Sequence, residues 1–316
     1  MVLTYILNMP RKKVNLADYI VPLYMNGLQG RMMRIPGPKT RHREILFVYG
    51  HHASLERHFG VAEMLSRYGT VTVPDLPGFG GMQSFYKLGE KPTIDNLADY
   101  LASFVKLQYK RKKVTIVGMS LGFAIVTRML QRFPELVPKV ELLISFVGFV
   151  HKDDFHFSRR NYLLLRYTAS YFSRRLPAWV GQHLALRPTF IRATYLLIAE
   201  RNSKLKDADD AERRRRIDFE IGLWQGNDLR TYMDTGVSML TLDLCHAQVA
   251  LPVYHIVVSE DRYFNNDVVE QHLGVIYKEV NIVRSAMPNH GPTVISDAKA
   301  AGVFMPRRIR QLLAAR

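Results

Sequence analysis

The feature that most constrains the fold of this chain is a G-x-S-x-G pentapeptide at residues 118–122. A short, β-branched, apolar segment (113–117) precedes it and predicts a buried strand. Apolar residues at helical spacing follow it until Pro134, so that residues 121–133 are expected to form a helix. The pentapeptide is therefore predicted to form a tight strand-to-helix turn.

Such a turn explains the glycines and suggests a role for the serine. Gly118 and Gly122 occupy positions at which the turn leaves little room for a Cβ. The turn lifts the hydroxyl of Ser120 clear of the sheet. It also aims the backbone N–H of Leu121, at a helix N-terminus, toward any negative charge that forms beside that hydroxyl.

Strands and helices alternate on both sides of the turn. Two early extended segments, 19–24 and 29–34, are expected to pair as an antiparallel edge hairpin. Alternation of this kind implies right-handed crossovers and a mostly parallel sheet with helices on both faces, so we predict an eight-stranded α/β fold. The other predicted strands are 44–49, 71–73, 114–117, 140–147, 253–258 and 280–284, and the predicted helices are 58–68, 94–107, 121–133, 266–273 and the C-terminus.

The strand pattern is interrupted between residues 151 and 250, where only helical patterns occur. Because ligands bind over the carboxyl ends of parallel strands, an excursion between two strands can cover them. We therefore predict an α/β core formed by residues 1–150 and 251–316, with a helical lid (cap) at 151–250. Aromatic residues in the lid are expected partly to pack it onto the core and partly to form an apolar acyl pocket. They are Phe155, Phe157, Tyr162, Tyr167, Tyr171, Phe172, Trp179 and Trp224, and the predicted helices are 162–174, 188–198, 208–225 and 229–242.

A serine hydroxyl needs a base to act as a nucleophile, and the base needs an acid that orients it. His290 follows the predicted strand 280–284 and is the best candidate base. Asp261 follows the predicted strand 253–258 and is the best candidate acid. The order Ser120, Asp261, His290 is the one that this architecture imposes. Alternative acids are Glu260 and, more weakly, the pair Asp153 and Asp154.

Composition narrows the protein class. The single cysteine, Cys245, allows neither an internal disulfide nor a cysteine-rich metal site. The apolar start of the chain precedes the basic run 11–13, which is the wrong order for a secretory signal. The longest apolar run, near 142–150, is far shorter than the ~18 residues that a membrane span needs. We therefore expect a soluble, cytoplasmic protein.

The formal net charge is +16, with 44 basic and 28 acidic residues. The excess is concentrated in the segments 11–43, 106–113 and 307–316. The run Arg213–Arg216 has acidic neighbours and predicts an ion-paired, solvated helix. No nucleic-acid-binding motif accompanies the charge, so we favour a solvated surface. A weak contact with an anionic membrane surface is the alternative.

Five local patterns together resemble the α/β-hydrolase superfamily, in its single-domain, lid-bearing form. The resemblance spans about residues 45–313 and implies a lipase-like serine esterase. The patterns are Val48-Tyr49-Gly50-His51-His52, Asp75-Leu76-Pro77-Gly78-Phe79-Gly80, Gly118-Met119-Ser120-Leu121-Gly122, Ser259-Glu260-Asp261 and Asn289-His290-Gly291-Pro292.

The resemblance also implies an oxyanion hole made by the backbone N–H groups of His51 and Leu121. Tyr49 stands where the family usually has histidine, which puts the hydrogen bonding of this loop in doubt but leaves the backbone donor intact. Adjacent His51 and His52 in an extended loop point apart, and no third ligand is evident. We therefore expect neither a metal nor a cofactor.

The identity of the nucleophile narrows the chemistry. The epoxide hydrolases and dehalogenases that resemble this chain use aspartate at this turn, whereas serine favours acyl transfer. The predicted substrate is a small carboxylic ester with an apolar acyl part. Lactones such as acyl-homoserine lactones, thioesters and carbon–carbon bonds beside a carbonyl are alternatives. A non-catalytic binding protein on the same fold is a further alternative, although binding alone would place no demand on Asp261 and His290.

Overall fold

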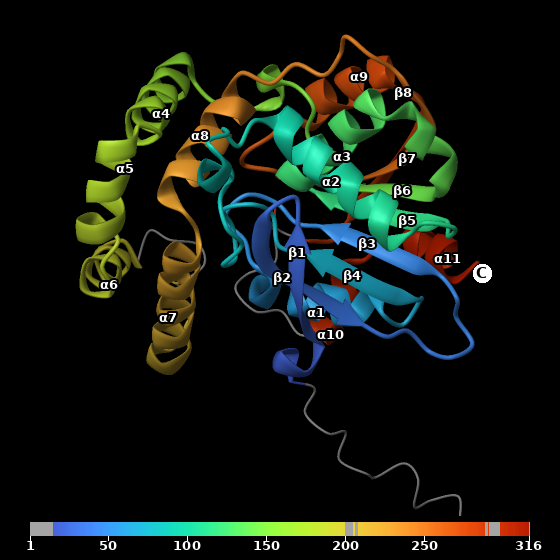
Figure 1. Ribbon diagram of the computed structural model, residues 1–316, viewed down its shortest axis with the longest axis horizontal. Helices are drawn as coiled ribbons and strands as arrows, with labels where there is room; N and C mark the ends of the chain where they lie inside the picture. The colour runs from blue at the N-terminus through green and yellow to red at the C-terminus, as the bar shows by residue number, and fades with distance from the viewer. Residues whose placement is uncertain (1–14, 200–204, 206–207, 288–289, 291–297, 316) are drawn as a thin grey trace, which may run out of the picture.

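The computed structural model describes residues 15–199, 205, 208–287, 290 and 298–315. Within these residues an eight-stranded sheet forms the centre of the molecule (Figure 1). Its strands, in spatial order, are β1 (Ile20–Met25), β2 (Leu28–Ile35), β4 (Thr70–Pro74), β3 (Glu44–Val48), β5 (Val114–Met119), β6 (Val140–Phe146), β7 (Val249–Val258) and β8 (Tyr277–Ser285). β1 pairs antiparallel with β2, β2 pairs antiparallel with β4, and the remaining neighbours are parallel. The predicted sheet and its edge hairpin are confirmed.

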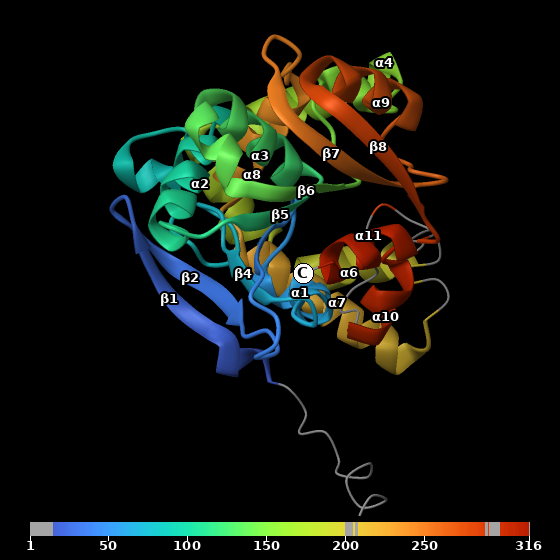
Figure 2. The same ribbon diagram turned by 90° about the vertical axis from the view of Figure 1, so that its right-hand side faces the viewer.

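Helices cover both faces of this sheet, as predicted (Figure 2). One face carries α2 (Ile94–Gln108), α3 (Leu121–Arg132) and α9 (Asn266–Ile276), and the other carries α1 (Leu55–Leu65), α10 (Ala298–Phe304) and α11 (Arg307–Ala314). Short 3₁₀ turns lie at Leu16–Tyr19, Phe85–Leu88, Pro134–Lys139 and Lys152–Asp154.

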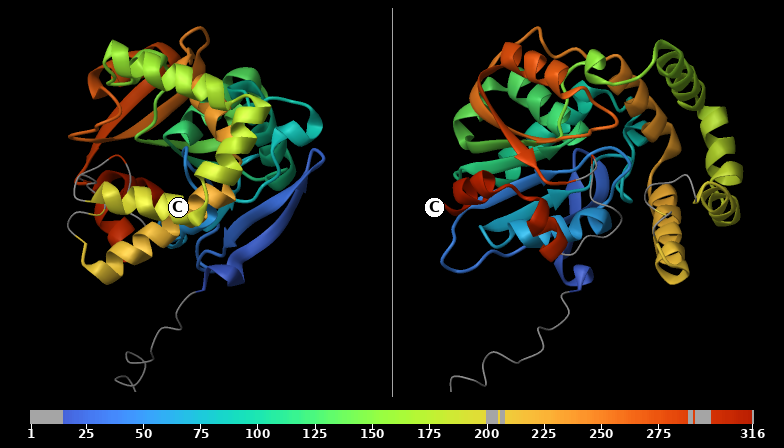
Figure 3. Two further views of the ribbon diagram at one scale, coloured as in Figure 1. Left: turned by 90° about the vertical axis from the view of Figure 1, so that its left-hand side faces the viewer. Right: turned by 180° about the vertical axis from the view of Figure 1, so that it is seen from behind.

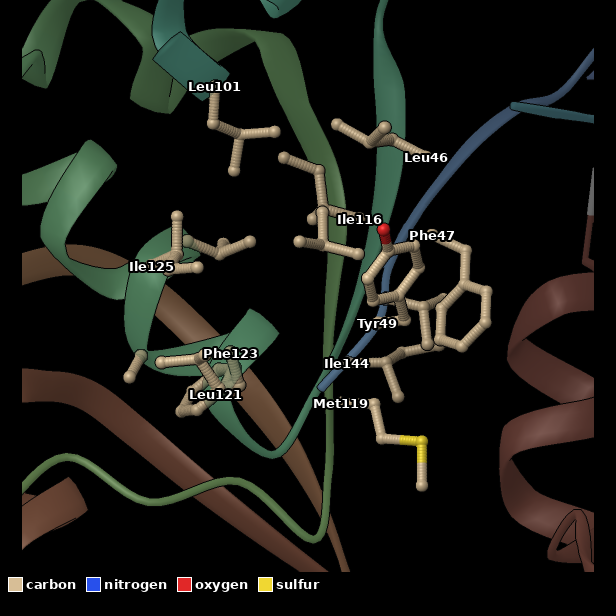
Figure 4. Close-up of a cluster of buried hydrophobic side chains, with 14 of the residues drawn as sticks. Leu46, Phe47, Tyr49, Leu101, Ile116, Met119, Leu121, Phe123, Ile125 and Ile144 are labelled. Atoms are coloured by element: carbon tan, nitrogen blue, oxygen red, sulfur yellow. The ribbon is translucent and has the colours of Figure 1, made fainter. Parts of the chain in front are cut away.

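The strands β3 and β5 lie in the core, between the two helical layers. Every residue of these two strands is buried, which explains why their sequences are nearly continuous apolar runs rather than alternating patterns. In Figure 4, Leu46 and Ile116 of the sheet lie beside Leu101 of α2, with Ile125 of α3 nearby. This packing fixes the carboxyl end of β5, where the G-x-S-x-G turn begins.

A helical insertion lies between β6 and β7. It contains α4 (Arg159–Phe172), α5 (Arg175–Val180), a π-helical turn (Gly181–Ala185), α6 (Pro188–Leu197), α7 (Asp210–Gly226) and α8 (Leu229–Leu240). α4, α5 and α6 run along the outer edge of the molecule, while α8 and α7 lie between them and the core (Figures 1 and 3). None of the described helices is both long and apolar enough to cross a bilayer.

The insertion matches the predicted helical patterns except at residues 175–185. Pro177 and Gly181 interrupt the apolar spacing there, so no helix was predicted, yet both α5 and the π-helical turn form. The arginine run of α7 is ion-paired as predicted: Arg213 pairs with Asp210, and Arg215 and Arg216 pair with Glu212. The division into a core and a lid that moves stays a prediction.

Candidate active site

Ser120 occupies a strained position between β5 and α3. Its φ of 49° and ψ of −120° are rare for a residue with a side chain. The flanking glycines are required by contact: a Cβ on Gly118 would lie 2.7 Å from the Cα of Phe123, and one on Gly122 would lie 2.2 Å from the carbonyl oxygen of Val48. The predicted tight turn is therefore present, and it holds the hydroxyl at the carboxyl end of the sheet.

The structure brings His290 and Asp261 to this hydroxyl. The Nε2 of His290 lies 3.1 Å from Ser120 Oγ, and its Nδ1 lies 2.7 Å from Asp261 Oδ2. The other oxygen of Asp261 accepts hydrogen bonds from the N–H groups of Tyr263, at 2.8 Å, and Phe264, at 3.2 Å. The Asp261 side chain is only 2% exposed. A carboxylate held by two amides has one fixed orientation, and this one directs Oδ2 at the imidazole.

The alternative acids lie elsewhere. Glu260 and Asp153 are exposed. Asp154 is buried, but its Oδ2 accepts the N–H groups of Val150 and His151, and its Oδ1 lies 2.6 Å from Nδ1 of His272. Of the described carboxylates, only Asp261 hydrogen-bonds to His290. The neighbours of this histidine in the predicted motif, Asn289, Gly291 and Pro292, lie outside the described residues.

The loop after β3 approaches the serine closely. A Cβ on Gly50 would lie 3.0 Å from Cβ of Ser120, so glycine is needed for this approach. Among the described residues, the backbone N–H groups of His51 and Leu121 have no acceptor. The N–H of Leu121 lies in the first turn of α3, where helical amides have no intrahelical partner. Their predicted role as an oxyanion hole stays a prediction.

The side chains of the two adjacent histidines point to different partners. His51 donates from Nε2 to the carbonyl oxygen of Tyr232, at 3.0 Å, and burial lowers its pKa to about 3. His52 places Nε2 2.9 Å from Glu220 Oε2. Both contacts fasten the loop to the insertion, through α8 and α7 respectively. In the described part of the chain no group of three or more His, Cys, Asp or Glu residues is arranged to hold a metal.

Tyr49 replaces the histidine that is usual in the family by making hydrogen bonds of its own. Its hydroxyl donates to Asp75 Oδ1 at 2.7 Å and accepts the N–H of Leu76 at 2.9 Å. Asp75 also accepts from Nε of Arg31 at 2.8 Å. The departure at Tyr49 is thus accommodated, and it links the loops that follow β3 and β4.

Buried titratable groups make stability depend on pH. Burial lowers the pKa of His51 and His58 to about 3 and that of His255 to about 4, whereas burial raises the pKa of Asp75 to about 7. As pH falls below 6.5, these three histidines become protonated in the unfolded chain but stay neutral in the folded protein. Asp75 does the opposite: it becomes protonated in the folded protein while it is still ionised in the unfolded chain. Stability should therefore decrease with falling pH, by roughly 2 kcal/mol per pH unit between pH 6 and 4.5. Urea unfolding at a series of pH values measures this slope.

Replacing one buried histidine measures its own contribution to the pH dependence of stability. His58→Gln should reduce the slope by roughly 1 kcal/mol per pH unit, because one titrating imidazole is removed. His42 is exposed, so His42→Gln is the matched control and should leave the slope unchanged. Equal slopes for His58→Gln and the parent protein would contradict this explanation.

A cavity of about 480 Å³ opens on Ser120 and His290. Its walls are mainly apolar. Phe155 and Phe157 line it, as predicted for some of the aromatic residues of the insertion. Tyr167, Tyr171 and Trp179 do not: they are exposed on the outer helices.

Sequence reasoning did not identify the wall that α8 contributes to this cavity. Tyr232, Met233, Gly236, Met239 and Leu240 line it. Their spacing of three and four residues is that of one helix face, which was a usable signal. The same spacing is equally typical of a helix face packed in a core, so the pattern alone could not assign these residues to a cavity.

Comparison with known proteins agrees with this geometry. The family described as "alpha/beta hydrolase fold" matches residues 45–272. Among curated proteins, no sequence matches this chain.

The proteins whose solved structures have a similar fold include hydrolases of different kinds. A Bacillus megaterium epoxide hydrolase is 15% identical with a TM-score of 0.61, covering 94% of this chain and 100% of its own. A structure from a study of Nitrososphaera gargenis carboxylesterases is 16% identical with a TM-score of 0.58, covering 94% and 96%. An enol-lactonase from Burkholderia xenovorans LB400 is 14% identical with a TM-score of 0.58, covering 84% and 91%. At such identities the likeness shows the fold alone.

The match to the family model extends over most of the chain and contains both the serine turn and Asp261. Because the match covers more than half of its residues, the chain belongs to the α/β-hydrolase family.

Proposed function

We propose that this protein is a serine hydrolase that cleaves carboxylic esters through an acyl-enzyme. One observation carries the proposal: His290 is within hydrogen-bond distance of both Ser120 Oγ and Asp261 Oδ2, at 3.1 and 2.7 Å. A nucleophile, a base and an orienting acid in this order are the elements that acyl transfer requires.

The reaction follows from these positions. Nε2 of His290 accepts the proton of Ser120 as Oγ adds to the ester carbonyl, and the oxygen of the tetrahedral intermediate takes the negative charge. The N–H groups of His51 and Leu121 stabilise that oxygen. The protonated imidazole, oriented by Asp261, then donates its proton to the departing alcohol. Water, deprotonated by His290, adds to the acyl-enzyme, and the carboxylic acid leaves as Ser120 regains its proton.

The apolar cavity supports an ester with an apolar acyl part as substrate. Turnover of p-nitrophenyl acetate, butyrate and octanoate tests the proposal, with Ser120→Ala as the control. Release of p-nitrophenol that disappears in the control supports it, and no release by the folded protein would favour a binding role. Ring opening of an acyl-homoserine lactone is assayed in parallel. A higher kcat/KM for the lactone than for the esters would favour the lactonase alternative.

The backbone assignment of the oxyanion hole predicts a mild effect of a side-chain change. His51→Ala keeps its N–H, so we expect kcat to fall less than about tenfold, far less than for His290→Ala. Because burial lowers the pKa of His51 to about 3, this imidazole is neutral from pH 5 to 9. The shape of the pH–rate profile should therefore be unchanged. A His51→Ala protein that is folded by circular dichroism but as inactive as His290→Ala would refute the assignment.

Gly236 of α8 offers a test of the acyl cavity. A Cβ there would meet only Ala169, at 3.9 Å, so a larger side chain fits and extends into the cavity. Gly236→Val should lower kcat/KM for the octanoate ester at least tenfold relative to the acetate ester. Gly222→Val on α7, where a Cβ would meet nothing within 4 Å, is the matched control and should leave that ratio unchanged. A ratio unaffected by Gly236→Val would show that the acyl chain binds elsewhere.

A further inference from the structure

The outer helices of the insertion present large apolar side chains to solvent. Leu164, Tyr167 and Tyr171 of α4 are 64%, 70% and 55% exposed, and Leu176 and Trp179 of α5 are 70% and 57% exposed. On α4 these residues are spaced by three and four, so they form one stripe on the helix. A single exposed leucine needs no explanation, but five large exposed apolar side chains on two successive helices indicate an interaction surface. We refer to these five residues as the outer apolar face.

The charged side chains of the segment 155–199, which contains α4, α5 and α6, are all positive. Residues 155–199 contain seven arginines and no lysine, aspartate or glutamate. Arg192 pairs with Asp218 of α7. The six other arginines of the segment have no carboxylate partner among the residues that the structure describes: Arg159, Arg160, Arg166, Arg174, Arg175 and Arg187. The overall net charge of +16 therefore includes a concentrated, unneutralised contribution at the outer apolar face.

The views agree on the position of this surface. α4, α5 and α6 form the outermost layer of the insertion, and α8 and α7 separate them from the sheet (Figure 3). The 14 residues of α4 correspond to a length of about 21 Å. An amphipathic helix on the outside of a protein can lie along a bilayer surface with its apolar side chains in the headgroup region.

We propose that the outer apolar face docks on an anionic lipid bilayer. Leucine, tyrosine and tryptophan side chains insert to the depth of the headgroups, while arginine side chains extend from the same helices to lipid phosphates. A second copy of the chain is a poorer partner, because a symmetric contact would place the arginines of α4 and α5 against one another. The absence of acidic residues from 155 to 199 suits an acidic lipid surface over the whole length of the layer.

Docking has a consequence for the substrate, which rests on the proposed function. Leu165, Thr168 and Ala169 of α4 line the active-site cavity, while Leu164 and Tyr167 of the same helix belong to the outer apolar face. One helix thus separates the bilayer from the cavity. The proposed substrate class is accordingly an ester that is dissolved in the bilayer and enters the cavity beside α4.

Co-sedimentation with vesicles tests the docking without using activity. We expect the full chain to bind vesicles of phosphatidylcholine with 30% phosphatidylserine, to bind pure phosphatidylcholine at least tenfold more weakly, and to dissociate at high salt. Leu164→Ser/Tyr167→Ser/Trp179→Ser and Arg160→Gln/Arg166→Gln/Arg175→Gln should each weaken binding at least tenfold. All six positions are exposed, so folding and turnover of a water-soluble ester should be unchanged.

Matched controls remove exposed apolar area and charge elsewhere. Tyr24→Ser/Leu107→Ser removes exposed apolar residues, and Lys110→Gln/Arg111→Gln/Lys113→Gln removes three exposed charges. Both controls should bind vesicles as the parent protein does. Equal loss in the controls, or full binding by the α4–α5 variants, would overturn the proposal. So would a dimer in light scattering that the apolar triple variant dissociates, because it would make a second copy the occupant.

Two further results separate docking from catalysis. Vesicle binding without turnover of any ester would leave docking standing and remove the proposed function. Docking together with catalysis predicts that the arginine triple variant loses activity toward a vesicle-embedded p-nitrophenyl ester but not toward the soluble one. Equal activity of this variant on both forms would exclude delivery of substrate from the bilayer.

Discussion

Replacing Ser120 or His290 by alanine is expected to lower kcat by about 10⁴- to 10⁶-fold, and Asp261→Asn is expected to lower it less. Without Oγ there is no acyl-enzyme, and without the imidazole the hydroxyl keeps its proton. Asparagine at 261 keeps the shape of the side chain but removes the charge that stabilises the imidazolium. Because the three residues act as a unit, the double variant Ser120→Ala/His290→Ala should be no less active than either single variant. Steady-state kinetics with a p-nitrophenyl ester measures each effect.

The alternative acids Glu260 and Asp153 provide control variants for the Asp261→Asn experiment. Glu260 neighbours Asp261 but is exposed, so Glu260→Gln should keep near-native kcat. Asp153→Asn should do the same for the same reason. Near-native activity of Asp261→Asn together with an inactive Glu260→Gln or Asp153→Asn would show that the acid has been assigned wrongly.

Gly122→Ala is expected to produce a large loss of stability. Its Cβ would lie 2.2 Å from the carbonyl oxygen of Val48 and 2.5 Å from that of Tyr49. These oxygens are backbone atoms at the end of β3, which is fully buried and cannot move away as a flexible side chain could. We expect a loss of more than about 4 kcal/mol, which is a large fraction of the total stability of a domain. Urea unfolding followed by circular dichroism measures the loss.

A glycine on the insertion provides the comparison. A Cβ on Gly222 of α7 would meet nothing within 4 Å. Alanine is the better helix former by up to about 1 kcal/mol, so Gly222→Ala should be neutral or slightly stabilising. Similar unfolding midpoints for Gly122→Ala and the parent protein would mean that β3 and the serine turn are not packed as described.

Much of the fold could be predicted because its signals are local. The apolar run at 113–117 followed by G-x-S-x-G and a helical pattern identified β5, the turn and α3 within a few residues. The alternation of strands and helices identified the parallel sheet, since parallel neighbours require crossovers. At residues 175–185 the local signal failed, because Pro177 and Gly181 disrupt the spacing although the surrounding packing still allows helical turns.

Local signals could nominate the residues of the site but could not choose among them. Glu260 and Asp261 are adjacent in one loop, and the amides of Tyr263 and Phe264 decide which carboxylate turns toward His290. Likewise, the partner of Tyr49 could not be read from its neighbours, because Asp75 follows a different strand. The site that the structure assembles supports the catalytic assignment, which kinetics will test.

The sequence by itself determined the order of strands and helices, the position of the serine turn and the set of candidate groups. Only the tertiary structure decided which carboxylate meets the imidazole, which face of α8 lines the cavity and which face of α4 is left uncovered. The physical reason is the range of the interactions. Turn geometry and helical spacing depend on neighbours within a few residues, whereas Ser120 and His290 meet across 170 positions of the chain. Such a contact is fixed by how the sheet orders its strands and how the insertion packs on it.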